Sequence, residues 1–340
     1  MNKAKFTNSL LDWYDQSKRI LPWRDNPNPY HVWISEIMLQ QTRVETVIPY
    51  FNRFIEELPT IYDLSVVDDD RLNKLWEGLG YYSRVRNLKK AAITIMNEFG
   101  GQIPQNQKEL ESLSGIGPYT SGAVLSIAFN KKYTAVDGNV LRVFARILGI
   151  RENIKEPLIK KEIKDNVEKL LPMKRVGDFN QGLMEIGATV CLPNGAPTCS
   201  VCPFNNICVA YNKGLINEIP AKQQKKKKRE EDITVFVIRY NDEFAIEQRP
   251  SSGLLAGLFQ FPYIEGHKNH REVSALFPGA KVQRIQDGKH IFSHIVWHQI
   301  GYEIKVDNKF DKYIWTSKSD IESTYSIPTA FKVYKKYILK

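Results

Sequence analysis

Two carboxylates stand in contexts that suit acid–base chemistry. Glu36 has apolar neighbours on both sides, Ile34 and Ile37–Leu39. A carboxylate in apolar surroundings holds its proton more tightly, as a general acid near neutral pH requires. An exposed glutamate is the ordinary alternative. Asp137 precedes a predicted helix over residues 140–148. We expect it to cap that helix and, as an ionised carboxylate, to face a cation that develops during a reaction.

All four cysteines of the chain fall in one short stretch. They are Cys191, Cys199, Cys202 and Cys208, with the spacing C-x7-C-x2-C-x5-C. Such clustering favours a metal or iron–sulfur site over a disulfide framework. Four thiolates satisfy either a zinc ion or a [4Fe–4S] cluster, and the spacing alone leaves both open.

Two glycines, Gly115 and Gly117, lie between two helical patterns, the second of which begins near Thr120. Glycine allows a tight turn and a close approach of backbone N–H groups to an anion. The following helix N-terminus adds its positive end. We therefore predict a helix–hairpin–helix that grips a DNA phosphate. An ordinary turn between two helices is the alternative.

The elements that must position these residues change character along the chain. Apolar residues recur at helical spacing from residue 5 to about residue 215, with breaks at 22–29, 78–80 and 100–104. This pattern predicts an all-helical domain. Strand-like runs follow over residues 232–240, 243–249 and 290–306, and a helix is expected within 265–277. These runs predict an α+β domain.

Residues 222–229, KQQKKKKR, separate the two patterns and hold six positive charges in eight residues. We interpret them as a solvated tether with incidental contact to DNA; a strap that contacts phosphates is the alternative.

Length, composition and charge restrict the class of protein to which the chain can belong. The chain has 340 residues, 42% hydrophobic and 25% charged, which suits two globular domains and excludes collagen, coiled-coil and disordered classes. No apolar run is long enough for a membrane span, and no secretory signal is present, so we expect a cytoplasmic protein with no membrane partner. The net charge of +10 favours a polyanionic partner, and from the charge alone the candidates are nucleic acid and an anionic membrane face.

Taken together, these pieces resemble the helix–hairpin–helix DNA glycosylases that carry an iron–sulfur cluster, and within them the adenine DNA glycosylase (MutY) family. The resemblance covers nearly the whole chain. The stretches that carry it, besides the cysteines, are LPWR (21–24), WISEIMLQQTRVETVIPYF (33–51), GLGYYSRVRNL (78–88), LSGIGPYTSGAV (113–124), VDGNVLRVFAR (136–146), GLLAGLFQFP (253–262) and FSHIVW (292–297).

The resemblance implies a multidomain fold. Residues 1–215 would form the helical glycosylase domain, with a [4Fe–4S] cluster loop at 191–208. Residues 216–232 would be a basic linker, and 233–340 a Nudix-like domain that recognises the lesion.

The resemblance also assigns the chemistry. It makes Glu36 the general acid that protonates adenine and Asp137 the carboxylate that stabilises the sugar cation. Tyr119 stands where glycosylase-lyases of the endonuclease III type place a nucleophilic lysine. Because tyrosine cannot form a Schiff base, a monofunctional glycosylase is implied. Tyr119 and Asn139 would orient Asp137 and the attacking water.

Three sets of residues are implied to contact DNA. Gln41 and Tyr81 would fill the space that the flipped base leaves. The adenine pocket would be formed by Trp23, Arg24 and Gln181. The loop that recognises 8-oxoguanine would be formed by Phe292, Ser293 and His294. The implied partner is double-stranded DNA with adenine opposite 8-oxoguanine or guanine, bound by a monomer, at the nucleoid if the source is a bacterium.

The C-terminal stretch resembles Nudix hydrolases without their metal-binding carboxylates. Tyr263, Ala275 and Leu276 stand where that family has glutamates, which predicts a recognition module and disfavours a pyrophosphohydrolase. An endonuclease III-like enzyme and a non-catalytic DNA-binding protein are the other rivals.

This chain departs from the glycosylase pattern at three places. Seven residues separate the first two cysteines where six are usual, Ser114 replaces a proline, and Phe259-Gln260 replace a Trp-Glu pair.

Overall fold

The computed structural model describes residues 2–25, 27–193, 196–221 and 227–340. The chain divides into two compact units. The first comprises Met1–Val66 and Arg86–Gln224, and the second Val67–Val85 and Lys225–Lys340. A short segment from the first quarter of the chain therefore packs with the C-terminal part. The predicted tether at 222–229 lies largely outside the described residues.

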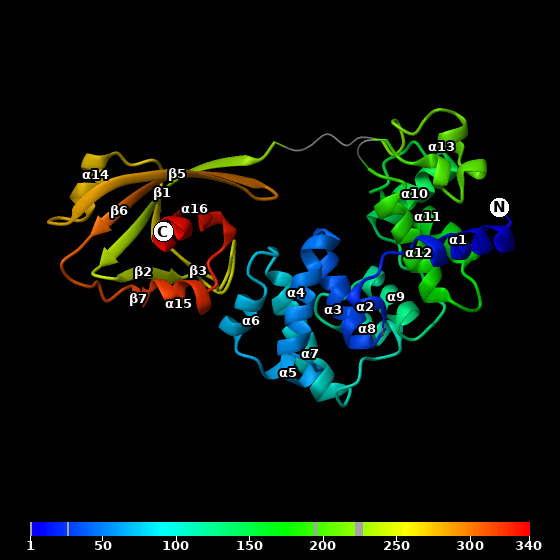
Figure 1. Ribbon diagram of the computed structural model, residues 1–340, viewed down its shortest axis with the longest axis horizontal. Coiled ribbons are helices and arrows are strands. Elements are labelled where there is room, and N and C mark those ends of the chain that lie inside the picture. Colours follow the sequence, from blue (N-terminus) through cyan, green and yellow to red (C-terminus); the bar gives the residue numbers. More distant parts are fainter. Residues whose placement is uncertain (1, 26, 194–195, 222–226) are drawn as a thin grey trace. The chain divides into compact units, whose positions relative to one another are not determined.

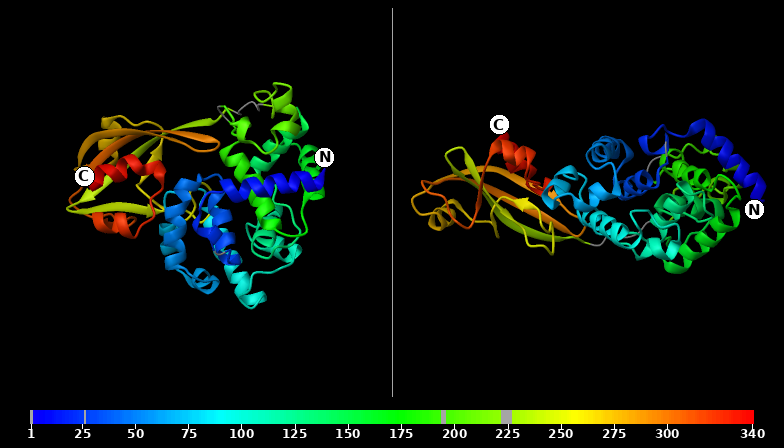
Figure 2. Two further views of the ribbon diagram at one scale, coloured as in Figure 1. Left: turned by 45° about the vertical axis from the view of Figure 1, so that its right-hand side comes forward. Right: turned by 90° about the horizontal axis from the view of Figure 1, so that it is seen from below.

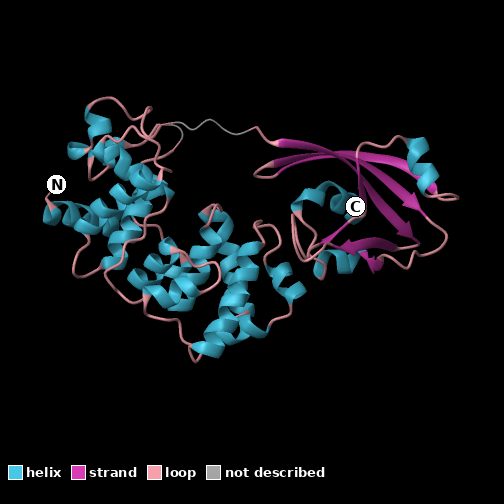
Figure 3. Ribbon diagram, turned by 180° about the vertical axis from the view of Figure 1, so that it is seen from behind, coloured by secondary structure: helices cyan, strands magenta, loops and turns pink. Residues whose placement is uncertain are grey.

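The first unit is helical, and its described residues contain no strand (Figure 3). This confirms the all-helical prediction for this part of the chain. Its helices are α1 (Lys3–Ser17), α2 (Pro22–Asp25), α3 (Pro29–Leu39), α4 (Val44–Glu57), α5 (Ile61–Val66), α7 (Ser83–Glu98, whose first turn belongs to the second unit), α8 (Gln107–Ser112), α9 (Pro118–Ile127), α10 (Gly138–Leu148), α11 (Pro157–Leu170), α12 (Val176–Thr189) and α13 (Val209–Asn212), with short 3-10 turns η1 (Cys199–Val201) and η2 (Asn205–Ile207).

Local signals set where several of these helices begin and end. The side chains of Asn28, Asn106 and Asp137 accept hydrogen bonds from the first-turn N–H groups of α3, α8 and α10. Such caps satisfy donors that have no partner inside the helix. Gly149 ends α10 in the left-handed region, with a φ of 75°. The predicted break at 22–29 is wrong in part, because Pro22 opens the short helix α2, a position where its missing N–H costs nothing.

The first helix packs against helices from much later in the chain. Figure 1 shows α1 (blue) beside the green helices α10 to α12. Phe6 of α1 lies in the same apolar core as Phe144 and Phe179. Its ring also stacks on Phe204, with centroids 4.1 Å apart. Phe204 lies in the cysteine-containing stretch, so α1 helps to fix that stretch on the helical core.

A mixed β-sheet dominates the second unit. Its main path runs β3-β2-β1-β6-β5, with β4 also paired to β1 and β7 to β2. β1 and β2 are antiparallel neighbours. β1 and β6 run parallel. The strands are β1 (Arg229–Tyr240), β2 (Glu243–Gln248), β3 (Phe259–Gln260), β4 (Tyr263–Glu265), β5 (Lys281–Ile291), β6 (Ile295–Lys305) and β7 (Ile314–Ser317).

Helices cover both faces of this sheet. Because strand side chains alternate, β1 sends Val235 and Val237 into one core and Phe236 and Ile238 into another. The first core is closed by α16 (Lys332–Leu339), which lies against the sheet in Figures 1 and 2. The second is closed by α14 (His270–Leu276), within the range expected for a helix. The unit also contains α6 (Asp69–Leu75), α15 (Lys318–Ser323) and η3 (Thr329–Phe331).

The single strand predicted over 290–306 is wrong. β5 ends at Ile291 and β6 begins at Ile295, so the predicted strand is a hairpin. The backbone N–H of Phe292 donates to the carbonyl of Ile295 at 2.9 Å, which closes the turn. The turn makes residues 292–294 the tip of a loop.

No helix in the described part of the chain is long and apolar enough to cross a lipid bilayer.

Candidate active site and DNA-contacting residues

Glu36 is a buried carboxylate on α3, with 6% of its surface exposed. Of the nine consecutive helix positions 30–38, all but His31 are buried, so α3 is a core helix rather than an amphipathic one. The hydroxyl of Tyr119, on α9, donates to Glu36 Oε2 at 2.5 Å. Burial raises the pKa of Glu36 to about 7; the Tyr119 hydrogen bond opposes the shift, the charge of Asp137 adds to it, and Arg24 opposes it. Glu36 can therefore hold and release a proton near neutral pH.

Asp137 lies close enough for its charge to act on Glu36, and it caps α10 as predicted. Its Oδ1 accepts from the backbone N–H of Val140 at 2.8 Å, and its Oδ2 accepts from Asn139 Nδ2 at 2.7 Å. Burial raises the pKa of Asp137, while these donors and the charge of Arg142 oppose the rise. The site therefore pairs one carboxyl that keeps a proton with one that is held by donors.

Arg142 connects this cap to the cysteine-containing stretch. Its guanidinium donates to Asn139 Oδ1 at 2.9 Å, to the Gly187 carbonyl at 2.8 Å and to the Cys191 carbonyl at 2.9 Å. A Cβ on Gly187 would come within 2.5 Å of the Asn139 Cβ, so only glycine lets α12 approach this closely. The sequence reasoning did not single out Arg142. The signal was present, since an arginine inside the apolar run of α10 needs a buried partner.

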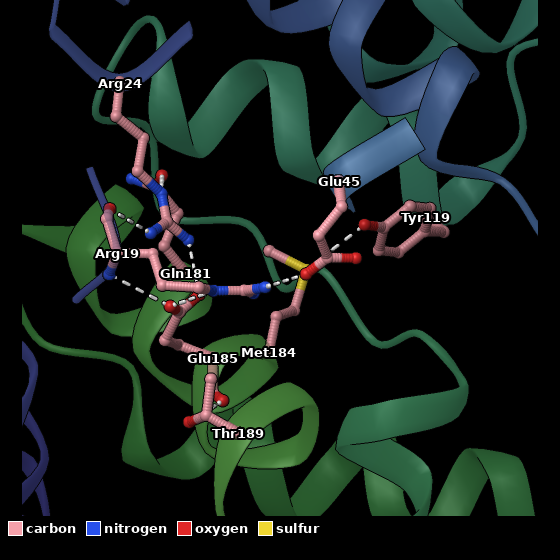
Figure 4. A network of polar contacts seen from close by, with 8 residues as sticks. All are labelled: Arg19, Arg24, Glu45, Tyr119, Gln181, Met184, Glu185 and Thr189. Carbon is pink, nitrogen blue, oxygen red and sulfur yellow. Dashed lines mark hydrogen bonds and ion pairs between the residues drawn. The ribbon is translucent and has the colours of Figure 1, made fainter. Parts of the chain in front are cut away.

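Arg24 and Gln181, two of the predicted adenine-pocket residues, contact each other, as Figure 4 shows. Arg24 Nε donates to Gln181 Oε1 at 3.1 Å, and Arg24 Nη2 donates to Glu185 Oε2 at 2.7 Å. Because guanidinium only donates, the Gln181 oxygen faces Arg24 and its NH₂ group is left for another acceptor. Trp23, the third predicted residue, is buried and packs edge-on against Phe51, with centroids 5.2 Å apart.

Glu185 was not singled out from the sequence, although a glutamate within the apolar stretch of α12 was a signal. Its two oxygens accept from Arg19 Nε at 2.7 Å and from Arg24 Nη2 at 2.7 Å. Burial alone would raise the pKa of Glu185, but the hydrogen bonds from Arg19 and Arg24 lower it to about 2. Met184 was also missed; it lies 3.1 Å from the Tyr119 hydroxyl.

The predicted hairpin joins α8 to α9 through residues 113–117. Gly115 has a φ of 79°, and a Cβ there would come within 2.8 Å of the Asn87 Cβ. Both Gly115 and Gly117 are exposed, and Gly117 is the N-cap residue of α9. The backbone N–H groups at the start of α9 are therefore open to a phosphate.

Gln41 and Tyr81, the residues predicted to fill the space that the flipped base leaves, share an uncommon backbone conformation. Gln41 has a φ of 59° and Tyr81 a φ of 48°, in the left-handed region that costs energy for residues other than glycine. Both side chains are exposed. Strained, exposed residues of this kind concentrate at functional sites.

The predicted reading loop lies at the tip of the β5–β6 hairpin. Ser293 and His294 are exposed, while Phe292 is half-buried against Trp297, with centroids 5.0 Å apart. The Ser293 Oγ lies 2.9 Å from the Tyr81 hydroxyl, so the structure brings two predicted DNA-contacting residues together although 212 positions separate them.

The four cysteines line one largely apolar cavity beside α10 and α12. In the described part of the chain, no three Cys, His, Asp or Glu side chains converge tightly enough to hold a single metal ion. Arg146 Nη1 donates to Cys191 Sγ at 3.2 Å. Burial raises the pKa of Cys202 to about 12, so its thiolate needs a positive partner in the cavity. Part of the spacing between Cys191 and Cys199 lies outside the described residues.

Comparison with known proteins gives the family. The family described as HhH-GPD superfamily base excision DNA repair protein matches residues 34–169. The family described as NUDIX domain matches residues 234–337. An adenine DNA glycosylase from Buchnera aphidicola subsp. Schizaphis graminum is 36% identical over 331 residues, which cover 95% of this chain and 94% of the relative.

The chain belongs to the adenine DNA glycosylase family.

Other comparisons agree with that assignment. The adenine DNA glycosylase of Rattus norvegicus is 35% identical over 354 residues, covering 85% of this chain and 68% of the relative. A solved structure of a thermostable thymine-DNA glycosylase has 31% identity and a TM-score of 0.57, covering 62% of this chain and 97% of that one. The predicted fold, a helical HhH-GPD domain followed by an α+β NUDIX-like domain, is confirmed. As a member of the adenine DNA glycosylase family, the protein is an N-glycosylase of base excision repair.

Proposed function

We propose that this adenine DNA glycosylase is monofunctional and removes adenine opposite 8-oxoguanine or guanine from double-stranded DNA, acting as a monomer. The observation that carries the proposal is the pairing of Glu36, with its pKa near 7, and Asp137, held by the donors at the start of α10. Protonation of a leaving group and stabilisation of a sugar cation require two carboxyl groups, one that keeps a proton and one whose charged form is stabilised by hydrogen-bond donors.

In this mechanism Glu36 donates its proton to N7 of adenine, which improves the leaving group as the bond to the sugar breaks. Asp137 stabilises the cation that develops on the sugar, and a water then adds to that cation and loses a proton, which leaves an abasic sugar. Asn139 holds one oxygen of Asp137, and Tyr119 holds Glu36. Since the side chain at position 119 is a phenol, no Schiff base with the opened sugar forms there, and the strand is not cut.

The base must leave the helix before it reaches these groups, at a cost of a few kcal/mol. We propose that Gln41 and Tyr81 fill the vacated space, and that Gly115 and Gly117 hold a phosphate. The adenine would bind against Trp23, with the NH₂ group of Gln181 offered to an acceptor on the base. Phe292, Ser293 and His294 would read the opposite base. The cellular site would be the cytoplasm, at the nucleoid in a bacterium.

We propose the same domain boundaries as the resemblance implies: 1–215 for glycosylase chemistry, 216–232 as linker and 233–340 for recognition. The recognition role is supported by the second unit, where the position of a metal-binding carboxylate is taken by Tyr263. Its hydroxyl accepts from Arg249 Nη1 at 3.3 Å. The same guanidinium nitrogen also donates to Gln260. Neutral side chains here would not hold Mg²⁺ on a pyrophosphate.

A [4Fe–4S] cluster held by Cys191, Cys199, Cys202 and Cys208 is the proposed cofactor. Four thiols lining one cavity could hold either a zinc ion or a [4Fe–4S] cluster, and the resemblance to the cluster-carrying glycosylases favours the cluster. The cluster would supply the charge that buried thiolates need and would fix the stretch that accepts from Arg142. Iron, sulfide and zinc analysis of the purified protein tests this, and one zinc per chain would contradict it.

A single-turnover assay tests the activity. Duplexes would hold adenine opposite 8-oxoguanine, adenine opposite guanine, or an oxidised pyrimidine, and products would be scored before and after alkali. We expect wild type to release adenine, with strand breaks only after alkali. Asp137→Asn keeps an oxygen for the α10 cap and should abolish release. Pyrimidine release with spontaneous breaks would contradict the proposal, as would tight binding without any release.

A further inference from the structure

We propose that Lys74, Glu77 and Lys335 form a clasp that positions Tyr81 beside Ser293, so that reading of the base opposite adenine and insertion of Tyr81 are one event. The proposal rests on the proposed function, which gives Tyr81 and Ser293 their places on DNA. The three clasp residues are positioning residues, and none of them needs to touch the DNA.

The clasp joins α6 to two segments more than 250 positions away in the chain. Glu77 Oε1 accepts from Lys335 Nζ of α16 at 2.8 Å, and Glu77 Oε2 accepts from Lys74 Nζ at 2.6 Å. Lys74 also donates to the carbonyl of Tyr325 at 3.1 Å. Next to it, Ser326 Oγ donates to the carbonyl of Asn73 at 3.1 Å. The α6 segment is therefore joined to the sheet domain by the Lys335–Glu77 ion pair and by two hydrogen bonds from side chains to backbone carbonyls.

The ion pairs of the clasp are partly shielded from water, which strengthens them. The side chains of Lys74, Glu77 and Lys335 are 13%, 18% and 17% exposed, whereas most ion pairs of the second unit have at least one partner that is far more open. Water screens an exposed pair strongly, so it contributes little. Here one carboxylate serves two ammonium groups. Its loss would leave two partly buried positive charges facing each other.

A braced loop transmits the position of α6 to Tyr81. Trp76 Nε1 donates to the carbonyl of Gly80 at 3.1 Å, and Arg84 Nη2 donates to the carbonyls of Leu79 and Gly80, both at 3.1 Å. The guanidinium of Arg84 lies over the rings of Trp76 and Tyr81, at 5.2 and 5.7 Å from their centroids. These contacts connect the loop that carries Tyr81 to Trp76, which directly follows α6.

The other partner, Ser293, is held as well. Lys228 Nζ donates to the Phe292 carbonyl at 2.5 Å, and Phe292 packs on Trp297. The Tyr81 hydroxyl and Ser293 Oγ then meet at 2.9 Å. Guanine and 8-oxoguanine differ at N7 and C8, where only the lesion has an N–H donor and a carbonyl. If the Ser293 hydroxyl contacts this edge of the base while it is hydrogen-bonded to Tyr81, the identity of the base affects the position of the Tyr81 side chain.

A double-mutant cycle tests the clasp. Glu77→Gln, Lys335→Gln and the double variant would be compared with wild type in single-turnover release of adenine opposite 8-oxoguanine and opposite guanine. We expect each single change to lower the ratio of the two rate constants about tenfold, mainly by slowing release opposite 8-oxoguanine. The double variant should be no worse than Glu77→Gln alone, because the ion pair that Lys335→Gln removes is one of the two that Glu77→Gln already breaks. Asp287→Asn, which breaks the exposed pair with Arg284 in the same unit, is the matched control and should leave the ratio unchanged.

Tyr81→Phe serves if the clasp variants fail to fold, since it removes only the hydroxyl that contacts Ser293. It should lower the same ratio while the ring can still stack. Unchanged ratios in all of these variants, with a selective wild type, would overturn the clasp and leave the proposed function standing. A wild type that releases no adenine, or releases it equally opposite both bases, would overturn the proposed function and the clasp together.

Discussion

Glu36 and Glu185 are two buried glutamates of the same helical unit with opposite acid–base behaviour. The pKa of Glu36 is raised to about 7, and that of Glu185 is lowered to about 2. Burial pushes both pKa values upward, so burial is not what separates them. The hydrogen-bond partners separate the two pKa values. Glu36 accepts from the neutral hydroxyl of Tyr119, while Glu185 accepts from the guanidiniums of Arg19 and Arg24.

The difference shows how one fold prepares two carboxyl groups for different work. A charged partner favours the ionised form far more than a neutral donor does. Glu185 is therefore ionised at neutral pH and binds Arg24, whereas Glu36 still carries a proton in part of the molecules at that pH. Arg24 links the two regions, because it binds Glu185 directly and its charge also acts on Glu36. Four predictions would break or sharpen this contrast.

The largest effect is expected from Glu36→Gln. The variant loses the only proposed source of the proton for adenine, so the single-turnover rate constant should fall about 100- to 10,000-fold. Glu45→Gln is the matched control, because the Glu45 side chain is 77% exposed on the next helix and forms a long ion pair with Arg19, at 4.0 Å. A rate within a few-fold of wild type for Glu36→Gln would remove Glu36 from the chemistry.

Glu185→Gln should act on stability instead. It leaves Arg19 and Arg24 without their carboxylate, and we expect the free energy of unfolding in urea to fall by about 3 kcal/mol. Asp178→Asn, in the half-exposed ion pair with Arg175, should cost less than about 1 kcal/mol. Equal losses in the two variants would mean that burial does not distinguish the two ion pairs.

The smallest effect is a shift in pH dependence. The wild-type rate constant should fall as pH rises above about 7, because Glu36 loses its proton. Tyr119→Phe removes a hydrogen bond that lowers the pKa of Glu36, so the midpoint of this fall should move to higher pH. A midpoint that stays in place or moves down would contradict the assigned cause.

The same group has a signature in stability. The pKa of Glu36 is higher in the folded protein than its usual 4.5, so its contribution to stability is present below pH 4.5 and is lost as pH rises through about 7. Unfolding measured across that range should show this loss in wild type and lack it in Glu36→Gln.

Local patterns predicted much of the helical unit because the signals act over a few residues. The cap at Asp137, the glycine turn before α9 and the helical periodicity each depend on neighbours within one or two turns. The errors arose where such signals conflict. Pro22 predicts a break, although proline also opens helices. Residues 290–306 predict one strand, because the turn at 292–294 has no glycine or proline.

The candidate site could be predicted only in part for a related reason. The motif around each carboxylate could be found in the sequence, but the bond from Tyr119 to Glu36 joins residues 83 positions apart. Glu185 and Arg142 carry a weaker signal, a charge within an apolar helix, which says that a buried partner exists without saying which. The clasp carries none, because Lys74, Glu77 and Lys335 look like ordinary surface charges.

The sequence by itself therefore determined which groups are available: two carboxylates, a phenol in place of an amine, four clustered thiols, and helices and strands that begin where caps and periodicity place them. Only the tertiary structure decided what those groups do to one another. It raises the pKa of Glu36 and lowers that of Glu185, and it places Tyr81 in one compact unit with the C-terminal domain. The physical reason is that electrostatic energy depends on distance and on exclusion of water, and both are properties of the packed chain rather than of residue order.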